Sequence, residues 1–352
     1  MTEDKGILIK NIYYMLTYAF QVLKQTNYDE IAAEEFEEIQ DLFAAILAKG
    51  VSQQLKQGLY REYINVNETR SSLRGKIDMP ETIKNRLQHK QVISCEYDEL
   101  SENTLHNQIL KTTISILIRS KGVSEDHKNA LRKNLLFFSQ IDEIDPALIQ
   151  WRRIKIQRSN RNYEMLLNIC YFVLDGMLQT TEKGSYKMAQ FSDEHMARLY
   201  EKFVLEYYRH NHKELSVNAS QVKWDLSKET DEASIKFLPI MQTDITLKDK
   251  TRTLIIDTKY YSKIMQTQFD TDTYRSGNLY QIFTYVKNQD VANSGNVSGM
   301  LLYAKTGESI TPNASFMMSG NKISIKTLDL NMHFSQIAAQ LDSIVVEHFL
   351  ES

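Results

Sequence analysis

The sequence predicts an α+β protein, with a mostly helical N-terminal half that holds a small β element and an α/β C-terminal half. Apolar residues recur at helical spacing through much of residues 10–140. Short apolar runs of strand type become frequent only after residue 216. The contents of glycine (12) and proline (4) are low, which favours long helices and few irregular linkers.

The N-terminal half contains the periodic segments that predict helices. In the first of them, Ile12, Met15, Leu16 and Ala19 form an apolar stripe. Residues 63–79 break this period and are expected to be extended segments around a turn, after which Pro80 begins another helix. The expected elements are helices at 10–25 and 34–50, helical signals through 51–63, helices over much of 101–140, an extended basic segment at 151–163, and a helix at 163–178.

The C-terminal half contains segments with helical periodicity and segments with the periodicity of strands. The polar segment 179–192 is the expected linker, so we predict one domain over residues 1–180 and a second over 190–352. The expected elements of the second domain are helices at 193–210, 276–288 and 334–350, and strands at 217–225, 235–247, 252–261 and 298–305.

Composition excludes several classes of protein. A net charge of −3 argues against a surface that is basic throughout, although local basic patches remain possible. The two cysteines, Cys95 and Cys170, lie far apart and have no partner at zinc-ligand spacing, so a structural zinc site is not expected. The chain begins without the pattern of a signal peptide and has no apolar run long enough to span a bilayer. A reduced, cytoplasmic protein is expected.

Three charges in two predicted strands are the main functional signal. Asp257 and Lys259 are two apart, so they share one face of a strand, and Asp244 lies on the strand before it. A hairpin centred between Lys250 and Thr251 would place Asp244 opposite Asp257, whereas a centre one residue earlier gives a diagonal pair. In both registers the three charges reach one point.

Two neighbouring carboxylates repel each other unless a proton or a cation lies between them. Mg²⁺ typically binds one or two carboxylates together with substrate phosphate, and a nearby lysine can position water and stabilise developing negative charge. An Asp–Lys bridge on a solvated strand is the ordinary alternative. The apolar run before Asp257, however, indicates a strand buried on both sides, and active sites of α/β sheets lie where such strands end.

Two flanking helices carry further candidates. Glu201 lies at the border of the apolar stripe of helix 193–210, where it could lean toward a metal. Gln281 and Tyr285 are spaced i, i+4 and therefore share a face of helix 276–288. Each of these residues, taken alone, is more typical of an exposed helix surface than of a site.

In this order, Glu201, Asp244, the Asp-x-Lys of 257–259 and the Gln-x-x-x-Tyr of 281–285 resemble the PD-(D/E)xK nuclease superfamily and its RecB-type branch. The resemblance implies a C-terminal nuclease core with a central mixed sheet. The sequence departs from the pattern at one point, because Asp244 does not follow a proline directly and Pro239 lies five residues earlier.

Six segments narrow the resemblance further: KNIYYMLTYAF, LRGKIDM, LYEKFV, MQTDIT, IIDTKYY and NLYQIFTYV. Together they are similar to the McrC family, the nuclease subunits of McrBC-type 5-methylcytosine restriction systems. The resemblance implies a partner, the McrB-type hexameric AAA+ GTPase, which reads methylated cytosine in double-stranded DNA. It implies that the N-terminal half engages this ring and stimulates GTP hydrolysis, while the C-terminal half cuts DNA.

The resemblance also assigns roles. Asp244, Asp257 and Lys259 match the catalytic positions, and Glu201, Gln281 and Tyr285 match the supporting ones. Mg²⁺ is the implied cofactor, held by Asp244 and Asp257 with help from Glu201 and the Thr258 carbonyl. The chain has no G-x-x-x-x-G-K-[ST] phosphate loop, so GTP is expected on the partner. A stand-alone nuclease and a non-cutting activator of a ring NTPase remain as alternatives.

Two basic clusters complete the candidates. Arg70, Arg74 and Lys76 surround Gly75, which would permit a tight turn, and the resemblance favours partner contact for this cluster. The second cluster consists of Arg152, Arg153, Lys155, Arg158 and Arg161. For both clusters, the alternative interpretation is an ordinary solvent-exposed basic surface.

Overall fold

The structure is a computed structural model, and it forms two compact units. One unit combines residues 1–42 with 176–352, and the other spans residues 43–175. The structure describes residues 3–4, 7–20, 34, 36–151, 154, 161–175, 178–180, 186–188, 193–227, 229, 231–260, 266–268, 271–305 and 311–350.

A mixed six-stranded sheet organises the first unit, as predicted for this half of the chain, in the order β16-β17-β15-β12-β11-β8. Strands β12, β15 and β17 run parallel, whereas β8, β11 and β16 are each antiparallel to their neighbour. The strands are β8 (Ser216–Asn218), β11 (Ile245–Lys248), β12 (Thr253–Lys259), β15 (Val297–Ala304), β16 (Ala314–Met318) and β17 (Asn321–Leu328).

Strand β12 lies between β15 and β11, and its residues are buried from Thr253 to Thr258. Such continuous burial is typical of a parallel strand covered on both faces. Helix α10 (Ser276–Gln289) packs on β12, β15 and β17. The core beneath α10 consists of Val222, Met241, Ile255, Ile282, Tyr285, Val286, Val297, Leu301, Tyr303, Ile323 and Ile325.

Two further helices hold the first residues of the chain to the sheet unit. Helix α1 (Ile9–Phe20) packs along α8 (Asp193–Asn211), which in turn packs on β12 and β8. The Asn11 amide donates 2.7 Å bonds to the carbonyls of Leu330 and Met332, just before α11 (Phe334–Val345). The N-terminal helix therefore belongs structurally with residues 176–352, whereas the predicted limits of 1–180 and 190–352 separate the two.

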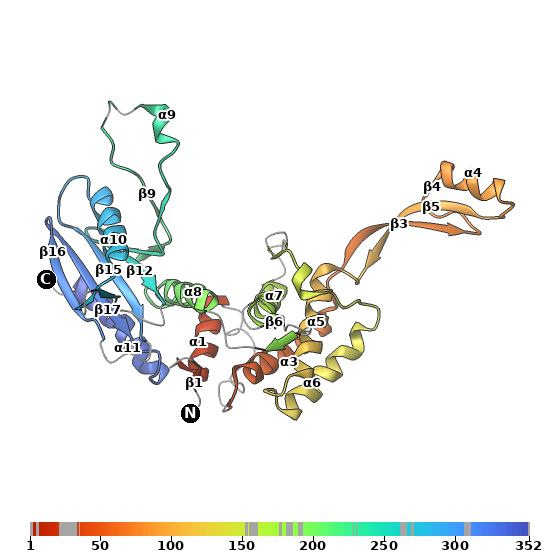
Figure 1. Cartoon of the computed structure of the whole chain (residues 1–352), viewed down its shortest axis with the longest axis horizontal. Helices are drawn as coiled ribbons and strands as arrows, with labels where there is room; N and C mark the ends of the chain where they lie inside the picture. Colours follow the sequence, from red (N-terminus) through yellow and green to blue (C-terminus); the bar gives the residue numbers. More distant parts are fainter. Residues whose placement is uncertain are drawn as a thin grey trace. The chain divides into compact units, whose positions relative to one another are not determined.

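The second unit is a helical body that carries a long β arm. Its helices are α3 (Ile39–Gln57), α5 (Leu105–Arg119), α6 (Glu125–Leu135) and α7 (Arg161–Leu174). The arm is a three-stranded sheet of β3 (Glu62–Arg70), β5 (Ile93–Ser101) and β4 (Lys76–Ile77). Figure 1 shows β3 and β5 extending away from the helices of this unit, with β4 and helix α4 (Met79–Leu87) at the far end.

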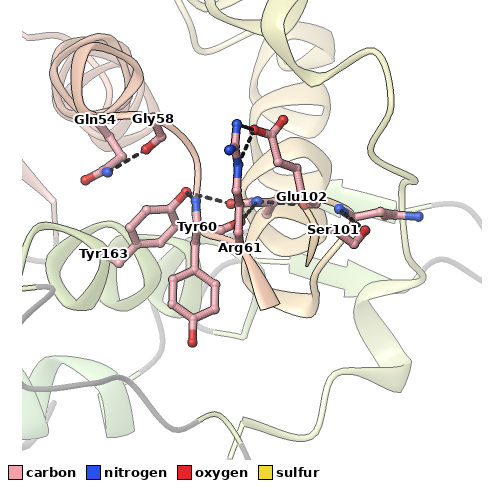
Figure 2. A network of polar contacts seen from close by, with 9 residues as sticks. Gln54, Gly58, Tyr60, Arg61, Ser101, Glu102 and Tyr163 are labelled. Atoms are coloured by element: carbon pink, nitrogen blue, oxygen red, sulfur yellow. Dashed lines mark hydrogen bonds and ion pairs between the residues drawn. The ribbon is translucent and has the colours of Figure 1, made fainter. Parts of the chain in front are cut away.

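The base of the arm is fixed to the helical body, as Figure 2 shows. The Tyr163 hydroxyl accepts a 2.7 Å bond from the Tyr60 N–H, at the start of the arm. At its other root, Glu102 accepts two bonds from Arg61, at 2.6 and 2.9 Å. The Asn107 amide joins both roots, because it donates to the carbonyls of Tyr60 and Glu102 at 2.8 and 2.7 Å.

Helix α4 is attached to the arm through polar contacts. The amide of Asn85, which is buried, donates a 3.0 Å bond to the Ser94 hydroxyl of β5. Met79, Ile83 and Leu87, which follow one face of the helix, are exposed. The contact with Ser94 therefore sets the side of α4 that faces solvent.

Several short elements complete the described chain. None of its described helices has the length and apolar character to span a bilayer. The short elements are β1 (Glu3–Asp4), β2 (Ile7–Leu8), η1 (Leu136–Phe138), η2 (Pro146–Leu148), β6 (Leu178–Thr180), β7 (Tyr186–Met188), β9 (Gln221–Val222), α9 (Glu232–Ile235), β10 (Met241–Gln242), β13 (Gln266–Gln268), β14 (Thr271–Thr273) and η4 (Val346–Leu350).

Some predicted elements differ from the structure. The single strand expected at 235–247 is wrong, because residues 235–240 are exposed and only β10 and β11 are paired there. The strand expected at 217–225 is likewise two short strands, β8 and β9. The helix expected at 34–50 continues as α3 to Gln57, into the segment where helical signals were expected. Strands β5, β16 and β17 were not predicted.

Candidate active site at the end of strands β11 and β12

The hairpin of β11 and β12 sets the spacing of the two aspartates. Ile245 pairs with Ile256 and Lys248 with Thr253, a register centred between Lys250 and Thr251. Extended by one residue, this register places Asp244 opposite Asp257. The first of the two predicted registers is therefore the one observed.

Asp257 is a fully buried carboxylate that forms an ion pair with Lys259. Its Oδ2 lies 2.6 Å from Nζ of Lys259, and neither carboxylate oxygen accepts a hydrogen bond of good geometry from a described donor. Burial and, secondly, the charge of Asp244 raise the pKa of Asp257 to about 6, against the opposing effect of Lys259. A buried carboxylate without donors favours a bound proton or cation.

Asp244 is held by the strand opposite it. Its Oδ2 accepts a 2.7 Å bond from the backbone N–H of Thr258 and a 2.9 Å bond from the Thr258 hydroxyl. Both donors reach the same oxygen, so one side of the carboxylate is fixed while Oδ1 takes no part in this contact. The part played by the Thr258 hydroxyl could not be predicted, because a strand residue between two charges was expected to face away from both.

A chain of contacts continues from the lysine to helix α10. Lys259 Nζ donates to Oε1 of Gln281 at 3.3 Å, and Gln281 Nε2 donates to the Tyr285 hydroxyl at 3.0 Å. The i, i+4 spacing places both side chains on the face of α10 that meets β12. The ammonium is thus held between the Asp257 carboxylate and the Gln281 amide oxygen.

Glu201 of α8 is close enough to sense the other charges of the site. Its half-buried position raises its pKa to about 7, and the charges of Asp244 and Asp257 add to this rise. Lys259 and Arg198 act in the opposite direction. The structure therefore brings the helix glutamate and the strand charges into one electrostatic site.

The donor set fits a hard divalent cation through two carboxylates. In the described ranges, no three acidic, histidine or cysteine side chains converge at metal-binding spacing. Mg²⁺ commonly binds one or two carboxylates and takes waters and phosphate oxygens for the remainder. The buried Asp257 oxygens without hydrogen-bond donors, beside Asp244, support this fit. Glu201 contributes charge to the site without forming a close group of three.

The basic cluster of the arm is largely engaged within the arm. Arg74 lies over the ring of Tyr97, 4.0 Å from its centroid, and its Nη2 is 3.3 Å from Glu99. Arg70 donates to the Tyr97 hydroxyl at 3.3 Å. Lys76 is exposed in β4. The tight turn expected at Gly75 is confirmed by its φ of +73°, and a Cβ there would lie 2.5 Å from the Glu96 carbonyl oxygen.

The second basic cluster cannot be placed in the same way. Arg152, Arg153, Lys155 and Arg158 lie outside the described residues, and nothing is described of the Arg161 side chain.

Comparisons with known proteins found similar chains. Residues 3–304 match the family described as McrBC 5-methylcytosine restriction system component. The chain is 29% identical over 352 residues to the Escherichia coli K12 protein named type IV methyl-directed restriction enzyme EcoKMcrBC, covering 98% of this chain and 99% of that protein. A solved chain is similar in fold, with a TM-score of 0.51 and 17% identity over 96% of this chain and 76% of that one. It comes from a tetradecameric assembly of Thermococcus gammatolerans McrB AAA+ hexamers with bound McrC.

Proposed function

Because this chain belongs to the family of McrBC 5-methylcytosine restriction system components, we propose that it is the DNA endonuclease subunit of a GTP-dependent restriction complex. Its substrate is double-stranded DNA that carries modified cytosine, and its partner is a hexameric AAA+ GTPase of the McrB type. One observation carries the nuclease assignment: the buried Asp257–Lys259 pair lies beside Asp244 at the end of a central strand.

The reaction is hydrolysis of a phosphodiester bond. Asp244 and Asp257 would hold Mg²⁺, the Thr258 carbonyl would be the third protein ligand, and Glu201 would add negative charge nearby. When bound, Mg²⁺ neutralises phosphate charge and lowers the pKa of its bound water.

Lysine 259 has the second role in the reaction. Its ammonium positions the attacking water and stabilises the negative charge that develops on the phosphate. Gln281 keeps the ammonium in place, since its Oε1 accepts from Nζ, and the Tyr285 hydroxyl fixes the Gln281 amide in turn. The contacts of Thr258 hold the Asp244 carboxylate in a single orientation.

The second unit engages the partner and stimulates its GTP hydrolysis. The absence of a phosphate loop from the sequence supports a division of labour in which the partner binds GTP. Arg70, Arg74 and Lys76 are proposed contacts to the ring. Charge reversal of Arg74 should weaken GTPase stimulation, and normal stimulation by the Arg74→Glu variant would exclude that residue.

The test is cleavage of cytosine-methylated plasmid in the presence of Mg²⁺ and GTP. The chain alone, the chain with its AAA+ partner, and Asp257→Ala with that partner are compared. Cutting only by the wild-type mixture is the expected result. Cutting by the chain alone would favour a stand-alone nuclease, whereas GTPase stimulation without any cutting would favour a non-cutting activator.

A further inference from the structure

The segment that joins β10 to β11 contains one residue more than the segment it faces. The last pair of β9 and β10 is Gln221 with Gln242, and the next pair along the chain, between β8 and β11, is Asn218 with Thr246. Three residues therefore lie between these pairs on one segment and two on the other. Such an unequal count is a β-bulge, which bends a strand and re-aims its side chains. We refer to residues 243–245 as the bulge.

The bulge determines which face of the sheet Asp244 meets. In an unbroken strand Met241 and Ile245 would share a face, because they are four residues apart. Met241 instead lies in the core beneath α10, whereas Ile245 is opposite Ile256, and neither isoleucine belongs to that core. The extra residue thus reverses the alternation of side chains. As a result, Met241 packs beneath α10 while Asp244 lies opposite Asp257.

Thr243, the first residue of the bulge, restores hydrogen bonds that the interrupted ladder would lose. It is only 1% exposed, so its polar groups need partners within the protein. Its N–H donates a 3.0 Å bond to the Ser220 carbonyl, and the Ser220 N–H donates a 3.0 Å bond to its hydroxyl oxygen. The side-chain oxygen of Thr243 therefore takes the place of a backbone carbonyl in this pair.

The Thr243 hydroxyl is fully used by its neighbours. It donates a 3.0 Å bond to the Ser220 carbonyl and lies 3.0 Å from the hydroxyl of Thr246, which can donate to it. A threonine hydroxyl has one proton and two lone pairs, and the contacts with Ser220 and Thr246 engage all of them. Thr243 and Thr246 lie on either side of Asp244 along the chain, so these bonds hold the backbone on both sides of that residue.

Position 243 is also the point at which the sequence departs from the PD-(D/E)xK pattern, since threonine stands there in place of proline. A proline would fix φ at this position, but it could not donate to Ser220 because it has no N–H. In this chain, hydrogen bonds restrict the backbone at the same position.

We propose that Thr243 is a positioning residue of the active site, which acts through the backbone of the bulge to hold Asp244 opposite Asp257. This inference rests on the proposed function and deepens it, because it names the residue that sets the separation of the two proposed metal ligands. Thr243 itself contacts neither metal nor substrate in this mechanism.

One hydrogen bond reports the position of Asp244 without any metal. The Thr258 N–H donates a 2.7 Å bond to Oδ2 of Asp244. This bond requires the carboxylate to be in place, so displacement of Asp244 should speed the exchange of the Thr258 amide proton with solvent.

The test compares three full-length variants with the wild type. Thr243→Val removes the hydroxyl and keeps a β-branched side chain of similar shape, whereas Thr243→Ser keeps the hydroxyl. Thr17→Val is the matched control, because Thr17 lies in the same unit, is buried and donates its hydroxyl to the Tyr13 carbonyl at 2.9 Å. Calorimetric titration gives the Kd for Mg²⁺, hydrogen exchange in EDTA follows the amides of Ser220 and Thr258, and thermal melting gives Tm.

We expect Thr243→Val to bind Mg²⁺ about 10–100-fold more weakly, as for loss of other groups that orient metal ligands. Its Ser220 and Thr258 amides should exchange faster than in the wild type. Thr243→Ser should restore both properties. Thr17→Val should lower Tm to a similar extent and leave both unchanged. With the AAA+ partner, Thr243→Val should lower kcat for plasmid cleavage and leave KM for DNA unchanged, because Thr243 orients a metal ligand and does not bind DNA.

Three outcomes decide between the possibilities. If Thr243→Val speeds exchange only at Ser220 and binds Mg²⁺ as the wild type does, its bonds hold the β9–β10 hairpin and not Asp244, and the proposal is wrong. It is also wrong if Thr243→Ser behaves like Thr243→Val, because the hydroxyl is then not the cause. If the wild type neither binds Mg²⁺ nor cleaves DNA with its partner, the proposed function fails, whereas exchange at Thr258 still decides whether Thr243 positions Asp244.

Discussion

Replacing Asp257 by Asn should abolish cleavage and yet stabilise the metal-free protein. The carboxylate is buried with no described hydrogen-bond donor besides Lys259, and its pKa in the folded protein is about 6 instead of the ordinary 3.8. Between these two pH values the folded state binds more protons than the unfolded state, so the free energy of unfolding decreases as pH rises. Above pH 6 the ionised carboxylate lowers stability by its full amount.

The size of this effect follows from the shift. About two pKa units correspond to roughly 3 kcal/mol. The attraction between Asp257 and Lys259 is already included in this net shift. At pH 8 we therefore expect Asp257→Asn to raise the free energy of unfolding by up to about 3 kcal/mol, or roughly 6–12 °C in Tm for a unit of this size. Near pH 4 both forms are neutral at this position, and the difference should vanish.

The assay is calorimetry in EDTA at pH 4 and pH 8, repeated at pH 8 with Mg²⁺. The matched control is Asp290→Asn, because Asp290 is a buried aspartate whose pKa lies at about 2, held down by bonds from Asn321, Ser294 and Gly295. The bonds to ionised Asp290 stabilise the folded protein fully at pH values above 3.8, the ordinary pKa of aspartate. Asp290→Asn should therefore have a lower free energy of unfolding than the wild type at pH 8. Mg²⁺ should raise the Tm of the wild type and not that of Asp257→Asn.

A lower stability of Asp257→Asn than of the wild type at pH 8 in EDTA would show that the ionised carboxylate does not destabilise the folded protein. The same holds if the difference were equal at both pH values, because ionisation of the buried carboxylate would then not be its cause. Either result would mean that Lys259 satisfies Asp257 fully and that the pair is structural.

Three further predictions concern other parts of the chain. Lys259→Ala should lower the cleavage rate by about 10²–10³-fold, with partner binding and GTPase stimulation unchanged in parallel assays. Mg²⁺ should bind the wild type more weakly at pH 6 than at pH 8, because protons on Asp257 and Glu201 compete with the cation, and Glu201→Gln should reduce this pH dependence; an unchanged dependence in calorimetric titration would exclude Glu201. Asn107→Ala should destabilise the second unit by about 1–3 kcal/mol and speed hydrogen exchange in β3 and β5, and unchanged exchange would mean that the arm is held by other contacts.

The structure brings several of the expected site residues together where local sequence sets the geometry. The apolar side chains in residues 253–256 can be buried on both faces only in a central, covered strand. The period of two in that strand then places Asp257 and Lys259 on one face. Helix α10 was predicted almost to its observed ends, and the i, i+4 spacing of Gln281 and Tyr285 led directly to the contact between them.

Other features depend on segments that are distant in the chain. Strand β5 alternates Ile93, Cys95 and Tyr97 with polar residues over only part of its length, and β3 pairs with it along its whole length. The basic pattern around Arg74 indicated a free charged tip, whereas Tyr97, 23 positions later, covers that guanidinium. The association of α1 with α8 likewise joins residues that lie some 180 positions apart, so a domain boundary drawn along the chain could not include it.

Residue order alone was sufficient to identify which groups carry charge at the end of β12, because strand and helix periods are local properties of the backbone. Residue order was not sufficient to predict the protonation of these groups or the side of α4 that faces solvent. Both depend on burial and on hydrogen-bond donors that come from other elements: Ser94 turns α4, Thr258 holds Asp244, and no donor reaches Asp257 besides Lys259 within the described chain. Desolvation is a property of the packed molecule, and it sets the pKa values on which the proposed chemistry depends.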